Sequence, residues 1–553
     1  MKKMVSVNVN GSGSREYECG TSLLSICHEF QSLFPTNIVA AKVNNIVKDL
    51  NSILTDNCTI DFLDMTTTEG MRVYQRSLVF VLVAAARELY PEGEVTVEHS
   101  LSKGLYCELH FGREVVAKDI CKLEECMRKI IAANLSFVRK KVAKDDALEL
   151  FKASGQPEKV RLLEQLARDS ASIYYCGDVY DYFYGTMVPG TGYLKLFEIR
   201  HCAPGIILRF PEKERPDELP EFVEQPKLAK IFHEAEEWGR VLRCGYVGAL
   251  NQAVQENKID EIVRVAEALH EKKLAQIADY IAGHRKEVRV ILVAGPSSSG
   301  KTTFAKRLNV QLRVNGVRPE SISLDDYFVD RGLTPRDENG NYDFESIEAL
   351  DLELFNEHLV RLLKGENVKI PTYNFIVGQR EYRGHTLQLE PDQPVIIEGI
   401  HGLNERLTKA VGHDQKVKIY ISAITQLSID NHNRIPTTDT RLIRRIVRDS
   451  QFRAHDALQT LQLWPSVRRG EERNIFPFQE EADIMFNSAL IYELGVLKSY
   501  AEPLLKEVTS DKSEYSEAMR LLNFLSFFRS INIDEVPSNS ILREFLGKSC
   551  FYK

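Results

Sequence analysis

The chain has 553 residues, 43% of them hydrophobic and 27% charged, and carries a net charge of −8. This length predicts roughly three or four domains of ordinary globular composition. The negative charge gives no indication of nucleic-acid or anionic-membrane binding. The ten scattered cysteines include no CxxC pair, the first residues show no secretory signal, and the apolar runs are too short for a bilayer. These features indicate reduced thiols and a cytoplasmic protein.

The first residues predict a small mixed α/β domain over residues 1–64. Val5, Val7 and Val9 alternate with polar residues, which predicts a half-buried strand, and Asn10-Gly11 predicts a hairpin turn after it. A short helix at 21–30 and strands at 38–43 and 59–63 complete the unit.

A second domain is predicted over residues 65–212. It begins with a helix at 74–90, has a strand at 104–111, helices over roughly 119–170 and a β-rich stretch at 172–210. Within that stretch, Pro-Gly-Thr-Gly at 189–192 predicts a turn between two strands. A Pro- and charge-rich linker and further helices follow at 213–285.

The remaining unit, residues 286–553, alternates apolar strands with periodic helices. The apolar runs lie at 288–294, 321–324, 394–398 and 417–421. Continuous apolar strands separated by helices predict a parallel sheet covered on both faces. The stretch 482–553 is predicted as helices packed on this core, without a chemical role.

A phosphate-binding loop follows the first of these strands and opens a helix, matching GxxxxGK[ST] in its required context. Its glycines let backbone N–H groups turn toward the phosphates of ATP, Lys301 supplies charge to the β/γ oxygens, and the Thr302 hydroxyl can bind Mg²⁺. The candidate nucleotide-binding residues are Gly295, Pro296, Ser297, Ser298, Ser299, Gly300, Lys301, Thr302 and Thr303.

Two further strands end in acids, where the ligands of parallel sheets bind. Asp325 and Asp326 follow strand 321–324, and either could accept a proton from an attacking hydroxyl. Glu398 ends strand 394–398, the usual position of an acid that orients Mg²⁺.

A predicted helix carries a row of arginines: Arg441, Arg445 and Arg448 share one face, with a cap expected at 437–439. Such a row beside a phosphate site can neutralise the charge that develops during phosphoryl transfer.

Residues 288–500 resemble the uridine kinase and phosphoribulokinase family, because six motifs occur in the order found in that family. They are GPSSSGKTT, DDYF, YDFESIEALD, PTYNF, IIEG and DTRLIRRIVRD. The resemblance implies an ATP- and Mg²⁺-dependent kinase in which Asp325 is the catalytic base and Glu398 a magnesium ligand. It also implies that Lys301, Arg445 and Arg448 act in catalysis. Glu345, Tyr373 and Arg453 would bind the substrate.

The sequence departs from that family at two positions on the acceptor side. Gly378 stands where uridine kinases carry a histidine, which predicts open space beside the base, and Glu345 is one methylene longer than the usual aspartate. A sugar-phosphate kinase like phosphoribulokinase stays an alternative, with Arg380 and Arg383 as cations for the acceptor's own phosphate.

The first half resembles threonyl-tRNA synthetases. Residues 1–64 are similar to their TGS domain, a β-grasp module, and residues 65–212 to their editing-type domain. Arg76 and Phe80 occupy the positions of the metal-type HxxxH pair of that domain. Of its CxxxH pair, Cys176 would remain, and Tyr180 stands in place of the histidine. The resemblance therefore implies a degenerate module that binds or regulates.

The expected fold is multidomain α/β: a β-grasp unit, an α+β synthetase-like unit and a P-loop NTPase parallel sheet flanked by helices. The expected function is phosphorylation of a nucleoside hydroxyl, with uridine or cytidine as the small-molecule partner and ATP and Mg²⁺ as cofactors. An RNA-associated ATPase that uses the synthetase-like half is the alternative from another class. A homo-oligomer is possible, whereas membrane and nucleic-acid partners are not expected.

Overall fold

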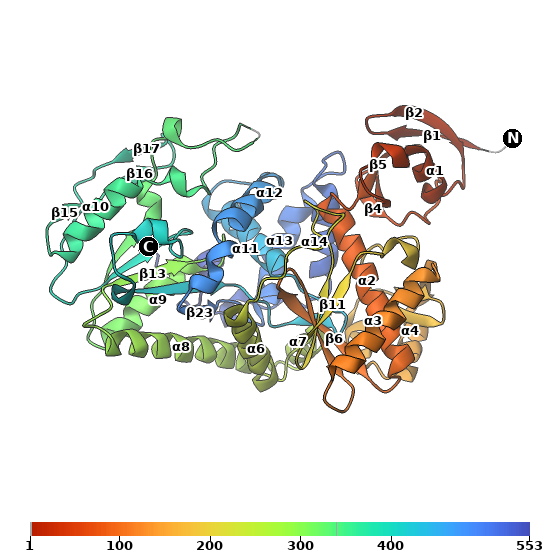
Figure 1. Cartoon of the computed structure of the whole chain (residues 1–553), viewed down its shortest axis with the longest axis horizontal. Coiled ribbons are helices and arrows are strands. Elements are labelled where there is room, and N and C mark those ends of the chain that lie inside the picture. The colour runs from red at the N-terminus through yellow and green to blue at the C-terminus, as the bar shows by residue number, and fades with distance from the viewer. Residues whose placement is uncertain (1–2, 339, 553) are drawn as a thin grey trace.

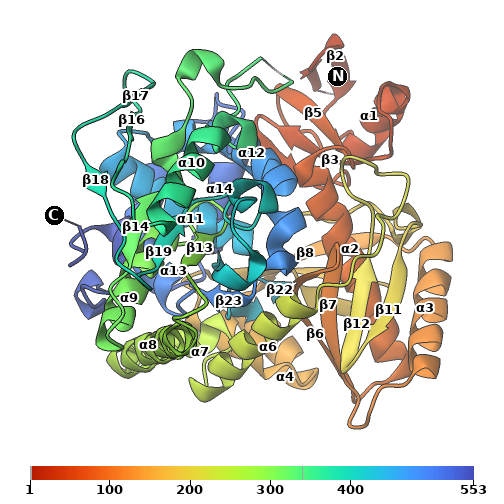
Figure 2. The same cartoon turned by 60° about the vertical axis from the view of Figure 1, so that its left-hand side comes forward.

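The computed structural model describes residues 3–338 and 340–552. Figure 1 shows a small unit at the N-terminal end, a second α+β unit beside it, and a large unit built around a sheet. The last residues return to the large unit, where the C-terminal end lies beside α9 (Lys301–Val314) (Figures 1 and 2). Among the described residues, no helix is long and apolar enough to span a membrane.

The first unit is a mixed five-stranded sheet covered by one helix, in the strand order β2-β1-β5-β3-β4. Strands β1 and β5 are parallel and the other pairs antiparallel, which is a β-grasp arrangement. The apolar face of the helix packs on the alternating valines of the first strand, as the sequence predicts. The elements are β1 (Met4–Val9), β2 (Gly13–Glu18), α1 (Leu23–Phe30), β3 (Ile38–Val43), β4 (Ile46–Lys48) and β5 (Cys58–Asp64).

The second unit packs a long, buried helix and its neighbours on two antiparallel sheets, ordered β10-β9-β8 and β11-β12-β7-β6. The helices are α2 (Thr68–Leu89), α3 (Ala117–Ala132), α4 (Lys144–Ala153) and α5 (Pro157–Gln165). The strands are β6 (Glu94–Leu101), β7 (Gly104–His110), β8 (Phe137–Ala143), β9 (Ser170–Cys176), β10 (Val179–Tyr182), β11 (Glu198–Cys202) and β12 (Gly205–Arg209).

One expectation for this unit was wrong. The helices predicted over 119–170 are interrupted by β8, which pairs along its whole length with β9. That pairing partner lies about thirty residues away, so local periodicity did not reveal the strand. The Pro-Gly-Thr-Gly segment at 189–192 lies between β10 and β11, as expected, and runs into a 3₁₀ turn at Thr191–Tyr193, but the two strands belong to different sheets.

Three helices connect the second unit to the large one: α6 (Pro226–Val241), α7 (Val247–Gln255) and α8 (Ile259–Gly283). Helix α6 bridges them, because its Ile231 and Phe232 share one apolar cluster with Tyr106 of the second unit and Tyr420 of the large one. A buried cluster of charged side chains also joins the units, since Asp181 of the second unit lies 2.8 Å from His432 of the large one. Lys159 of α5 contacts Asp181 and lies 2.7 Å from His432 Nδ1.

The large unit is a five-stranded, fully parallel sheet in the order β14-β19-β13-β20-β23. Its strands are β13 (Val290–Ala294), β14 (Glu320–Ser323), β19 (Val395–Glu398), β20 (Lys416–Ser422) and β23 (Ile484–Asn487). Alternate residues of β13 enter different cores: Val290 and Leu292 pack with α10 (Leu352–Leu363), and Ile291 and Val293 pack with α9. Both faces of the sheet are therefore covered, as predicted.

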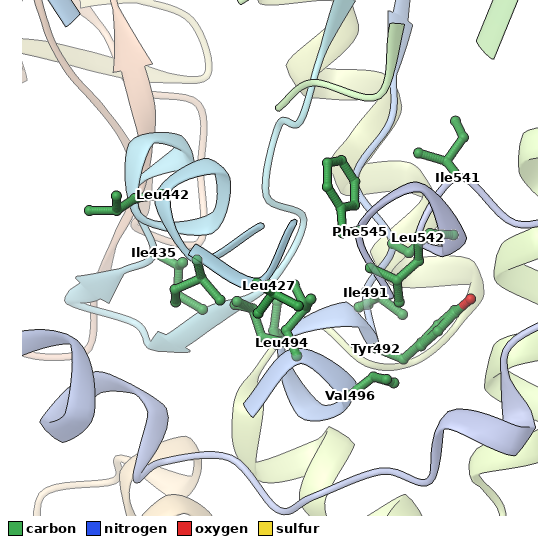
Figure 3. Close-up of a cluster of buried hydrophobic side chains, with 14 of the residues drawn as sticks. Leu427, Ile435, Leu442, Ile491, Tyr492, Leu494, Val496, Ile541, Leu542 and Phe545 are labelled. Carbon is green, nitrogen blue, oxygen red and sulfur yellow. The ribbon is translucent and has the colours of Figure 1, made fainter. Parts of the chain in front are cut away.

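The last stretch of the chain differs from its prediction. It contains α13 (Glu493–Lys506), α14 (Tyr515–Leu525) and the short α15 (Arg543–Leu546), but it begins with β23, the edge strand beside β20. The strand has only four residues, too few for its spacing to distinguish a strand from a helix. Figure 3 shows Ile541, Leu542 and Phe545 beside Ile491 and Tyr492 in the buried core.

Candidate active site

The phosphate-binding loop occupies residues 295–300 between β13 and α9, at the centre of the sheet. Gly300 has a φ of +84°, which favours glycine, and a Cβ on Gly295 would lie 2.1 Å from the Ile421 carbonyl oxygen. Both glycines of the motif are thus required by the backbone. Lys301 is the first residue of α9, and its ammonium donates to the Pro296 carbonyl at 3.2 Å. The amide-rich start of α9 faces the loop, which suits phosphate.

Thr302 and Glu398 come together beside this loop. Strands β13 and β19 are neighbours, and the Thr302 hydroxyl donates to Glu398 Oε1 at 3.3 Å. Burial raises the pKa of Glu398 to about 7, and Lys301 opposes the rise. A hydroxyl and a carboxylate are hard oxygen ligands of the kind that Mg²⁺ accepts when phosphates and water complete its octahedron. These two residues therefore fit the expected metal.

Asp325 and Asp326 lie in a 3₁₀ turn directly after β14, yet their surroundings differ. Asp326 accepts a hydrogen bond from the Tyr373 backbone N–H at 3.2 Å and so anchors β16 (Thr372–Asn374). Asp325 is open to solvent at one side, but the protein crowded around it raises its pKa, while Lys301 and Arg453 oppose the rise. Of the two acids, Asp325 is thus the one whose charge Lys301 and Arg453 favour.

Helix α11 (Thr437–Phe452) carries the arginines. Arg445 donates to the Ser297 hydroxyl of the loop at 2.8 Å. Arg445, Arg448 and Arg453 all approach the buried carboxylate of Asp449, at 3.2, 2.7 and 3.6 Å. One acid thereby gathers three candidate cations beside the phosphate loop.

Arg441 does not act with them, contrary to the expectation from their shared helix face. It is 1% exposed and forms a bidentate ion pair with Glu471 of α12 (Ala457–Asn474). It also donates a hydrogen bond to the Ser297 carbonyl at 3.1 Å, so it stabilises the main chain of the phosphate loop. The expected cap at 437–439 is also absent: the N-cap residue is Pro436, and Asp439 pairs with Arg520.

Glu345 lies on the acceptor side and packs closely on α12. A Cβ added at Gly470 of that helix would lie only 2.3 Å from the Cβ of Glu345. Burial and the nearby Glu471 raise the pKa of Glu345 to about 7, and Arg445 opposes the rise. Tyr373 is only 5% exposed and packs between Phe328 and Phe375. Its hydroxyl has no hydrogen-bond partner in the described part of the chain.

The space expected beside Gly378 is filled, so that prediction was wrong. Gly378 has a φ of +71°, and a Cβ there would lie 2.6 Å from Arg331 Nε. The two cations considered for a sugar phosphate are also engaged: Arg380 pairs with Asp351 at 2.9 Å and Arg383 with Glu381 at 2.9 Å.

One residue of the site was missed by the sequence interpretation. Glu471 accepts a hydrogen bond from the Ser297 backbone N–H at 2.9 Å, and no local pattern indicates this contact across 174 residues.

The synthetase-like unit has no comparable centre at the replaced editing positions. Arg76 donates to the Thr186 carbonyl at 2.7 Å, and the Phe80 ring packs on Phe137 and Phe183. Burial raises the pKa of Cys176 to about 11, and the Tyr180 hydroxyl donates to a main-chain carbonyl at 3.2 Å. In the described ranges, no group of three His, Cys, Asp or Glu side chains could hold a metal ion.

The two halves of the chain are similar to different groups of known proteins. The N-terminal region is 30% identical over 201 residues to the threonine–tRNA ligase of Syntrophomonas wolfei, covering 36% of this chain and 32% of that enzyme. The corresponding ligase of Francisella philomiragia is 29% identical over 201 residues, with the same coverage. The chain thus spans about a third of the length of these curated relatives.

The C-terminal half is similar to kinases. A putative fructose transport system kinase from Silicibacter sp. is 19% identical, with a TM-score of 0.28, covering 38% of this chain and 98% of that one. A possible uridine kinase from Bacillus stearothermophilus is 20% identical, with a TM-score of 0.26, covering 39% and 100%. Residues 290–491 match the Phosphoribulokinase / Uridine kinase family. This segment, which holds the phosphate loop and both strand-end acids, is therefore a P-loop kinase domain of that family.

Proposed function

We propose that this domain transfers the γ-phosphate of ATP to a hydroxyl of a nucleoside, with uridine or cytidine as the first candidates. The observation that carries the proposal is the convergence of three neighbouring strand ends. Lys301 of the loop after β13 acts electrostatically on both Asp325 after β14 and Glu398 at the end of β19. One edge of the sheet thus carries Lys301 as the cation for the phosphates, Glu398 as the acid for the metal and Asp325 as the acid for the proton.

The residues of this edge divide the reaction between them. Asp325 accepts the proton of the acceptor hydroxyl, whose oxygen then attacks the γ-phosphorus while the bond to the ADP oxygen breaks. Lys301, Arg445 and Arg448 stabilise the negative charge on the transferred phosphoryl group. Thr302 and Glu398 would hold Mg²⁺, which supplies further charge neutralisation at the phosphates.

A nucleoside suits the acceptor side better than a sugar phosphate does. Glu345 lies near Arg445 and Lys301, and its carboxyl group can bond ribose hydroxyls. A phosphorylated acceptor would need additional free cations, but both Arg380 and Arg383 are already paired with acids. Tyr373 would contribute an edge of the aromatic cluster, because most of its ring is buried.

The test is ATP turnover by the full chain, measured separately with uridine, cytidine, adenosine, inosine, ribulose 5-phosphate and tRNA. We expect ADP and a phosphorylated nucleoside in stoichiometric amounts. Lys301→Ala should abolish turnover, and Lys286→Ala, at an exposed lysine before β13, should leave it unchanged. Turnover only with the sugar phosphate would refute the nucleoside assignment, and full activity of Lys301→Ala would refute the role of the loop.

A further inference from the structure

We propose that the C-terminal segment 541–552 is an autoinhibitory element that occupies the phosphate-binding start of α9 and competes with ATP. The proposal rests on the ATP dependence proposed above. It assigns a role to a stretch in which the sequence indicated no chemistry, and it explains why the chain returns to the phosphate loop after completing the kinase core.

The central contact joins Glu544 to Thr303. The Glu544 carboxylate accepts a hydrogen bond from the Thr303 backbone N–H at 3.0 Å and another from the Thr303 hydroxyl at 2.7 Å. Thr303 is the third residue of α9, so its N–H has no partner within the helix. In a GxxxxGK[ST] loop, such amides cradle the phosphates of the nucleotide. A carboxylate oxygen therefore occupies a donor that a phosphate oxygen would need.

The rest of the segment encloses the same helical turn. The Ile541 side chain lies against Gly300, 2.6 Å from where a Cβ would stand. The Tyr552 hydroxyl lies 3.1 Å from the Thr303 hydroxyl. Lys306, one turn further along α9, donates to the Phe551 carbonyl at 3.0 Å and lies 3.6 Å from the centre of the Tyr552 ring. The contacts thus come from both ends of the segment.

Glu544 differs from Glu471, the other acid that bonds an amide of this loop. Glu471 is fully buried and neutralised by Arg441, so it belongs to the permanent support of the loop. Among residues 3–338 and 340–552, no lysine or arginine lies within 4 Å of the Glu544 carboxylate, although Lys306 of α9 attracts it electrostatically. Its negative charge is therefore stabilised by the start of α9 and by Lys306 one turn further, partners that a phosphate would also take.

Displacement does not require the segment to unfold. Ile541, Leu542 and Phe545 are buried beside Ile491 and Tyr492 (Figure 3), whereas Glu544 is only half-buried. Its side chain can rotate away while its neighbours stay packed. Because a phosphate and the carboxylate repel each other and share one donor, each bound state excludes the other. We call the state in which Glu544 bonds Thr303 the closed state. The apparent ATP affinity falls as the fraction of molecules in this closed state rises.

The experiment titrates a fluorescent ATP analogue into the full-length protein and its variants. For Glu544→Ala we expect the Kd to fall about 10- to 100-fold, because a charge-assisted contact holds the closed state. The Kd of Glu544→Gln should fall less than that of Glu544→Ala, since the glutamine amide oxygen still accepts hydrogen bonds. Asp534→Asn, at an exposed acid in the same region, should match the wild type.

Three outcomes separate the possibilities. Equal Kd values for the wild type and both Glu544 variants would overturn this inference alone. Weaker binding by Glu544→Ala would also overturn it, because Glu544 would then support the nucleotide. No nucleotide binding by any of the proteins would overturn the proposed function, and the inference with it.

Discussion

The Thr302 hydroxyl donates a hydrogen bond to Glu398 Oε1 across 3.3 Å, linking the phosphate loop to the end of the adjacent strand. The hydrogen bond joins the two residues that the sequence predicts, from separate motifs, as ligands of Mg²⁺. For Glu398→Gln we expect the Mg²⁺ concentration at half-maximal turnover to rise by at least ~10-fold, since a metal ligand loses its charge. Glu390→Gln, at an exposed acid before the same strand, is the matched control. An unchanged Mg²⁺ dependence would remove Glu398 from the metal site.

Asp325 and Asp326 are neighbours with different expected phenotypes. Asp325→Asn should lower kcat by ~10²–10⁴-fold with nearly unchanged ATP binding, because the proton acceptor is lost. Asp326→Ala should instead lower the apparent Tm and raise KM for the acceptor, since the Tyr373 N–H loses its partner. Steady-state kinetics and thermal melts distinguish the two. If Asp325→Asn retains kcat and loses only ATP affinity, the base assignment moves to Asp326.

Glu345 makes the stability of the protein depend on pH. Its pKa is about 7 in the folded chain against 4.5 for an ordinary glutamate, so the folded state holds the proton more tightly. Stability is therefore highest below about pH 4.5 with respect to this group and decreases as the pH rises toward 7. In Glu345→Gln the loss of stability between pH 5 and pH 8 should be smaller by roughly 2 kcal/mol.

Denaturant unfolding of wild type and variant at both pH values measures this difference. Glu221→Gln, at an exposed linker acid, should show the wild-type pH dependence. A Glu345→Gln protein whose stability changes with pH as much as the wild type would show that Glu345 is ionised in the folded state.

The acceptor site should discriminate between ribose and deoxyribose. A site that bonds a substrate hydroxyl rejects analogues without it by up to ~10⁴–10⁵-fold, so deoxyribonucleosides that lack a contacted hydroxyl should be poor substrates. Glu345→Ala should narrow the ratio of kcat/KM between uridine and deoxyuridine. Equal use of both nucleosides by the wild type would exclude Glu345 as a ribose ligand.

The synthetase-like unit should not deacylate mischarged tRNA. Arg76, Phe80 and Tyr180 hold three of the four editing positions, and each is engaged in packing or in a main-chain hydrogen bond. Incubation with mischarged seryl-tRNA should release no more serine than incubation with heat-denatured protein. Faster release by the native protein would contradict this prediction.

The sequence by itself determined the parts of the site that lie within one continuous segment. The loop 295–303, the strand-end acids Asp325 and Glu398, and the alternation of strands and helices follow from local spacing. Local spacing fixes backbone conformation and the face on which a side chain projects, so it also predicted the parallel sheet.

Only the tertiary structure decided which projecting side chains are available. Arg441 and Arg445 share a helix face, but their partners differ. Glu471, thirty residues after Arg441, forms an ion pair with Arg441 and neutralises it. Arg445 instead donates a hydrogen bond to the Ser297 hydroxyl of the phosphate loop. Glu544 reaches Thr303 across 241 residues, a pairing that no local pattern contains. Such contacts depend on where distant segments pack, because hydrophobic burial, which drives that packing, is non-directional and leaves no fixed spacing in the sequence.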